Sequence, residues 1–148
     1  MTKPKIASGD WVVVADGRKA LICENVGDEV FLNLKVIEER AIENPPTRAQ
    51  GADRPGRVHQ SVGSERSSVE DSDWHDEAER AFLKQLAERL HRAVSAGEVS
   101  GLILIAPSRA LGMIRPLLSA VVAEILRGEL DKDYVKLPIG DLEKRLKQ

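Results

Sequence analysis

The strongest constraint on the fold is the apolar run Leu102-Ile-Leu-Ile-Ala106, which ends at Pro107. A run that is apolar at every position is typical of a central parallel strand covered on both faces. Apolar residues then recur at helical spacing over 109–126, and Pro116 interrupts this stretch, so that residues 108–115 can form a separate first turn or short helix. The pattern predicts a strand that turns directly into a helix, a junction where α/β proteins often bind ligands.

Three β-strands are expected before this junction. Trp11–Ala15 is rich in β-branched residues, and Asp16-Gly17 predicts a two-residue hairpin in which both residues have φ > 0. The second strand is expected over 18–24 and the third over 30–37, where side chains alternate toward the two faces of a sheet. Residues 1–9 are expected to form a tail before this antiparallel meander.

A long polar loop is predicted for residues 43–73, which lack periodicity and are rich in Pro, Gly and Ser. Ser72 or Asp73 is expected to cap the following helix. Its apolar stripe repeats every four residues and consists of Trp74, Ala78, Phe82, Leu86, Leu90 and Val94. Gly97 is expected to end this helix.

The C-terminal part predicts an edge strand over 129–135 and a last helix over 138–147. The element order is therefore βββ, long loop, αβαβα. We expect an α/β fold in which residues 10–148 form a single domain with a mixed β-sheet and helices on both faces.

Composition narrows the cellular context. The 148 residues carry a net charge of −2, so no global field favours a polyanion, and a site for one would have to be local. Cys23 is the single cysteine, which excludes an internal disulfide, and its place in a strand predicts a buried, inert thiol. The first residues lack the apolar core of a signal peptide, and no apolar stretch is long enough to span a membrane, so a cytoplasmic protein is expected.

Three segments resemble the bacterial host attachment protein family, whose members are described as required for attachment to host cells. They are Trp11-Val-Val-Val-Ala-Asp-Gly-Arg-Lys-Ala20, Asp53-Arg-Pro-Gly-Arg57 and Leu102-Ile-Leu-Ile-Ala-Pro-Ser-Arg-Ala-Leu-Gly-Met-Ile-Arg115. The segments stand in the family's order and spacing, and Leu130-Asp-Lys-Asp133 fits its late edge strand. The resemblance covers about Asp10 to Leu146.

That family in turn is similar to the middle domain of archaeal and eukaryotic class-1 release factors. The kinship implies a ribonuclease H-like topology, with the 43–73 loop in the place of the loop that carries Gly-Gly-Gln in those factors. This chain has no Gly-Gly-Gln, and the nearest text is Pro55-Gly-Arg-Val-His-Gln60. Peptidyl-tRNA hydrolysis is therefore not predicted, and His59 as a base and Gln60 as an orienter of water are the candidates if the protein is an enzyme.

Two groups of residues are candidates for binding an anion. The loop carries Arg54 and Arg57, and the planar guanidinium suits bidentate contact with phosphate or carboxylate. Ser108, Arg109 and Arg115 stand at the strand-to-helix junction, where unpaired helix amides favour anions. The alternatives are a solvated loop in the first case, and a helix cap with a structural ion pair in the second.

No metal or cofactor is expected. The acidic run at 71–77 lacks the glycine and the distal glutamate of a calcium loop, and the histidines do not have zinc spacing. Acidic residues at a helix start are explained by the helix dipole. No glycine-rich phosphate loop is present.

The favoured function is a non-catalytic binding protein for an anionic partner, either RNA or the ribosome or a ligand that bears phosphate. A hydrolase acting from the loop and an interaction protein of an attachment or envelope pathway are the alternatives. Aromatic residues make up 3% of the chain, which argues against RNA recognition by base stacking. A surplus apolar face on the 109–126 helix would indicate a homodimer, and no membrane partner is expected.

Overall fold

The computed structural model describes residues 5–42 and 60–147, and for 60–75 it describes the backbone alone. Its elements follow one another as β1 (Trp11–Ala15), β2 (Lys19–Asn25), β3 (Leu34–Ala41), α2 (Gln60–Ser95), β4 (Leu102–Ala106), α3 (Ser108–Ile114), the 3₁₀ helix η1 (Arg115–Leu117), α4 (Ala120–Ile125), β5 (Leu126–Asp131) and α5 (Ile139–Lys147). No helix in the described ranges is both long enough and apolar enough to cross a membrane.

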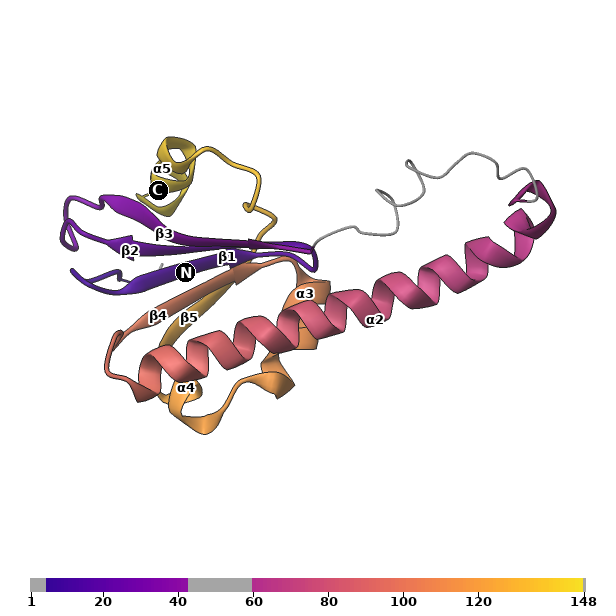
Figure 1. Cartoon of the computed structure of the whole chain (residues 1–148). Helices are drawn as coiled ribbons and strands as arrows, with labels where there is room; N and C mark the ends of the chain where they lie inside the picture. The colour runs from indigo at the N-terminus through magenta and orange to yellow at the C-terminus, as the bar shows by residue number, and fades with distance from the viewer. Residues whose placement is uncertain (1–4, 43–59, 148) are drawn as a thin grey trace.

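The five strands form one mixed sheet in the order β3-β2-β1-β4-β5. β1, β2 and β3 are antiparallel, and β1, β4 and β5 are parallel. Helix α2 crosses one face of the sheet together with α3 and α4, and α5 covers the opposite face (Figure 1). The predicted α/β class, the mixed sheet and the helices on both faces are confirmed.

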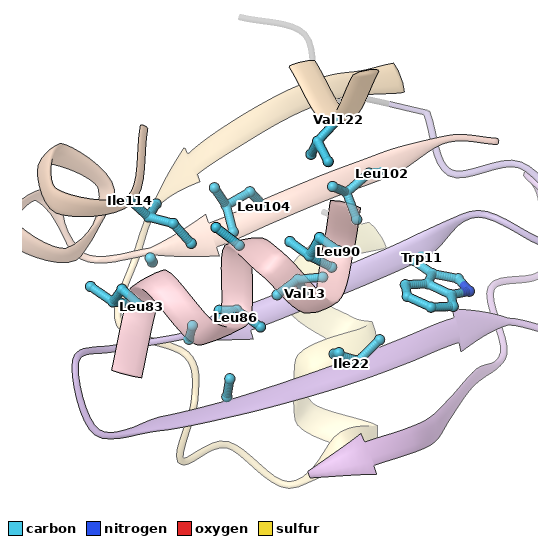
Figure 2. Packing of buried hydrophobic residues seen from close by; sticks show 14 of the residues in the cluster. Trp11, Val13, Ile22, Leu83, Leu86, Leu90, Leu102, Leu104, Ile114 and Val122 are labelled. Carbon is cyan, nitrogen blue, oxygen red and sulfur yellow. The ribbon is translucent and has the colours of Figure 1, made fainter. Parts of the chain in front are cut away.

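The core lies on both sides of β1 and β4, where every residue is buried. Under α2, the leucines Leu83, Leu86 and Leu90 pack against alternate residues of β1, β2 and β4 (Figure 2). The other side chains of the same strands pack against Val135 and Leu142. Replacing one of these buried leucines by alanine typically costs about 2–5 kcal/mol, so the two faces account for much of the stability.

The end of α2 was predicted correctly at Gly97, which has φ 77°. The amides of Gly97 and Glu98 donate to the carbonyls of Val94 and Ala93, the two bonds of a Schellman motif. The start of α2 differs, because the backbone is helical from Gln60 instead of Ser72 or Asp73. The stretch contains no proline, and its one glycine costs a helix only about 1 kcal/mol.

The third strand begins at Leu34, four residues later than predicted. Asn25 and Asp28 accept hydrogen bonds from backbone amides of the connecting loop and so replace a strand ladder there. Val30 and Phe31 consequently lie in this loop, with 74% and 72% of their surface exposed. The alternating pattern that predicted a strand from residue 30 therefore does not correspond to a strand at Val30 and Phe31.

The first turn also differs from its prediction. Of the glycines that the structure describes, only Gly9 and Gly97 have positive φ, so Gly17 does not adopt the mirror-image turn expected for Asp-Gly. The Asp16 carboxylate instead accepts bonds from the amides of Arg18 and Lys19. The tail is corrected as well, since Ile6 is buried and its carbonyl accepts a bond from the Asn25 side chain.

The helical region after β4 is divided at Pro116, as the sequence predicted. Pro116 lies in η1, between α3 and α4, in place of a single helix over 109–126. Strand β5 begins at Leu126, earlier than the predicted 129–135. Arg127 forms an ion pair with the buried carboxylate of Asp10, at 3.0 Å, which anchors the start of β5 to the N-terminal segment.

Candidate functional site

The parallel strands β1 and β4 end beside each other, and a cavity of about 280 Å³ opens at their carboxyl ends. The turn after β1 forms one wall and the start of α3 forms another. Asp133, just beyond β5, and Glu79 of α2 complete the cavity. A ligand site is expected at this edge of an α/β sheet, so the predicted junction does open on a cavity.

Charged side chains cross this cavity and pair with one another. Arg109 of α3 donates a hydrogen bond to Asp76 of α2 and lies 3.3 Å from Glu79 Oε1. Glu79 is also 3.9 Å from Arg18 in the turn after β1. A β-carbon on Gly17 would lie 2.7 Å from the Glu79 carboxyl carbon, so a side chain here would displace the end of Glu79. The cluster ties α2 to the ends of β1 and β4.

The other two junction residues, Ser108 and Arg115, contact strand β5. The Ser108 hydroxyl donates to Asp131 at the end of β5. Arg115 donates from Nε and Nη2 to one oxygen of Glu129, at 2.8 and 2.6 Å. These hydrogen bonds and the charges of Glu129 and Asp131 raise the Arg115 pKa, so the guanidinium stays charged. Since Glu129 and Asp131 are two residues apart, they share one face of β5.

The structure therefore brings Ser108 and Arg115 to one strand and turns Arg109 toward α2. Pro107 is the N-cap of α3, and Ser108, which was predicted as a cap, is the first helical residue. Ser108, Arg109 and Arg115 each contact a carboxylate. An anion at this edge would have to displace those carboxylates, and anion binding by these residues stays a prediction.

The predicted loop residues Arg54, Arg57 and His59 lie outside the described residues. Gln60 is the first residue of α2, and its side chain is not among those described. Helix α2 extends well past the sheet on its N-terminal side (Figure 1).

Thiol chemistry and metal binding were also considered for the described residues. Cys23 is buried, and burial together with the nearby Glu143 charge raises the pKa of its thiol to about 11, which confirms the predicted buried thiol. Within residues 5–42 and 76–147, no group of three or more His, Cys, Asp and Glu side chains could hold a metal ion.

A cluster that sequence reasoning missed joins α2 to β1 and β3. Arg89 donates to Glu38 at 2.9 Å and lies over the Trp11 ring, 5.6 Å from its centroid. Arg40 contacts the other oxygen of Glu38. Nothing in the sequence pairs Arg89 with Glu38, since 51 residues separate them.

The fold, then, is that of an α/β domain with a meander, a long α2 and a junction cavity. Among solved structures, the crystal structure of an archaeal translation termination factor, aRF1, matches with a TM-score of 0.46 and 14% sequence identity. The match covers 90% of this chain and 34% of that chain, so this chain spans about a third of the factor's length. No curated protein shows significant similarity to the chain.

Residues 10–146 match the family described as bacterial archaeo-eukaryotic release factor family 12. The match covers nearly the whole chain, so the protein belongs to this family. The predicted relation to release factors is thereby confirmed at the level of the family. The description of the family says nothing of host attachment, which stays a prediction.

Proposed function

We propose that this protein is a non-catalytic binding domain that contacts ribosomal RNA through the arginines between β3 and α2. Membership of a release-factor family over residues 10–146 is the observation that carries this proposal. Arginine guanidinium groups supply the bidentate phosphate contacts that RNA binding requires.

The arrangement of α2 supports the proposal. A helix of 36 residues is about 54 Å long, and among residues 76–95, the part of α2 whose side chains are described, the buried residues begin at Phe82. Its N-terminal part therefore projects from the domain body (Figure 1). Arg54 and Arg57 precede Gln60 by six and three residues, so the chain attaches them to this projecting end. Arginines attached to the end of a projecting helix suit contact with a large particle better than with a small ligand.

The overall charge of −2 is consistent with RNA contact through the arginines between β3 and α2 and not through the domain body. The domain body has no excess of positive charge with which to bind RNA over a broad surface. Arg109 and Arg115, the arginines of the strand-to-helix junction, are paired with Asp76 and Glu79 and with Glu129 respectively. We therefore assign RNA contact to the arginine segment, residues 48–66, which contains four arginines.

Co-sedimentation of the purified full-length protein with ribosomes tests the proposal. We expect binding at low salt that decreases at moderate salt, and we expect the Arg54→Ala/Arg57→Ala variant to lose most of it. A Lys136→Ala/Lys144→Ala variant is the matched control, because it removes the same charge from exposed positions of the domain body. Absence of binding at low salt, or equal loss in both variants, would contradict the proposal.

The hydrolase alternative is tested with the same ribosome preparation. Release of the acyl group from a peptidyl-tRNA analogue in the ribosomal P site would show catalysis, and its loss in His59→Ala or Gln60→Ala would assign it to these residues. We expect no release above the rate without protein. A role in an attachment or envelope pathway becomes the leading alternative if neither binding nor release is observed.

A further inference from the structure

A groove runs along α2 on the side that faces α3 and η1. It consists of two hollows of about 420 and 400 Å³, which meet at Leu117. Helix α2 forms one wall from Arg80 to Arg92, and α3, η1 and Ser119 form the other. The wall along α2 is about 18 Å long at 1.5 Å per residue.

The groove has an apolar floor and a basic rim. Ala81, Met113 and Leu117 contribute apolar surface, and 37% of Leu117 is exposed. Arg80 and Lys84 stand along the first hollow, and Arg92 stands along the second beside Glu88. Such a groove fits an amphipathic helix of acidic character.

The chain itself contains an acidic helical segment. Residues 60–77 of α2 carry six acidic side chains and one arginine, whereas residues 80–95 carry four basic side chains and one glutamate. The acidic half includes the part of α2 that projects beyond the sheet (Figure 1). A polar helical segment is only marginally stable by itself in water, so a second helix beside it would stabilise it.

We propose that two copies of the chain associate through antiparallel α2 helices, with the acidic half of each lying in the basic, apolar groove of the other. A two-fold axis near Ala78 would bring residue 71 of one copy beside residue 85 of the other. Asp71 then lies within one turn of Lys84, and Glu65 lies opposite His91. In the same register Val69 lies opposite Ala87, which lines the groove.

The charge pattern makes this interface closed and self-complementary. Because the two halves of α2 have opposite charge, antiparallel pairing matches acid with base twice, and parallel pairing sets like charges together. Each copy fills the groove of its partner, so no groove is left to recruit a third chain. The interface does not involve Arg54 or Arg57 and is independent of ribosome binding.

Light scattering on the full chain at micromolar concentration and low salt provides the first test. We expect a particle of twice the 16.3 kDa chain mass. Lys84→Glu and Asp71→Lys should each weaken the dimer at least about ten-fold, and the double variant should recover it, because the charges are exchanged. Lys144→Glu, an equal charge change on α5, should have no effect. A wild type that stays monomeric at every soluble concentration overturns the proposal.

Disulfide trapping tests the register. A chain with Ser72→Cys is mixed with a chain with Lys84→Cys under mild oxidation, and the buried Cys23 stays unreactive. We expect cross-linked dimer in the mixture and almost none from either chain alone, since antiparallel pairing separates like positions. Equal cross-linking in all three samples, or a dimer insensitive to the charge variants, would exclude this interface.

Discussion

At the residue scale, Glu38 shows how an exposed edge strand is joined to the core. Burial alone would raise the pKa of its carboxyl group, but the hydrogen bonds and charges of Arg89 and Arg40 outweigh it and lower the pKa below 4.5. A lowered pKa means that the folded state favours the carboxylate. This contribution to stability is complete above the unfolded pKa and is lost as the pH falls through the folded pKa.

Glu38→Gln should therefore destabilise the protein by about 1 kcal/mol at pH 7, because both partners are only partly exposed. Urea unfolding at pH 7 and at about pH 3 measures the effect. The difference from wild type should shrink as the pH falls, because the stability contributed by the carboxylate is lost as the pH falls through its lowered pKa. Glu39→Gln, at the exposed neighbouring position, is the control and should change little. An equal loss at both pH values would contradict the role assigned to the carboxylate.

At the element scale, the junction cluster determines where α2 leaves the domain. Glu79 lies against Gly17 and contacts Arg109, and Arg109 also holds Asp76. Asp76 is the first residue of α2 whose side chain contacts another element in the described part of the chain. We infer that this cluster fixes the point at which the helix parts from the body.

Gly17→Ala should loosen that attachment at little cost in stability. The new methyl group displaces the flexible end of Glu79 and so breaks its contacts with Arg18 and Arg109. Amide hydrogen exchange should become faster in α2 around residues 76–80, while the amides near Leu86 keep their protection. Gly140→Ala on α5 is the control, because its methyl group meets no atom within 4 Å. Unchanged exchange at residues 76–80 would refute the attachment.

The elements that could be predicted are those with a local cause. The apolar run of β4 and the break at Pro116 are local signals, and both were confirmed. The limits of β3 and β5 depend on contacts distant in sequence. Asn25 bonds to the N-terminal segment and to the following loop, and Arg127 pairs with Asp10 across 117 residues. Of the site, the junction could be predicted, whereas the partners of its charged groups could not.

At the scale of the whole molecule, the chain consists of a packed α/β body and a helix that reaches beyond it. The body accounts for stability, since both faces of β1 and β4 are buried. Among the α2 side chains that the structure describes, the buried ones begin at Phe82, and the N-terminal end of the helix extends beyond the body, where we propose that it serves a function outside the core (Figure 1). We propose that the arginine segment before α2 contacts the ribosome and that the side of α2 that lines the groove mediates self-association.

The salt dependence of ribosome binding tests the central claim most directly. Each phosphate contact contributes a slope of about 0.7–0.9 to the fall of log K with log salt concentration. If Arg54 and Arg57 each contact a phosphate, their replacement by alanine should reduce the wild-type slope by about 1.5, and Lys136→Ala/Lys144→Ala should leave it unchanged. A variant that binds with the wild-type slope would contradict the account.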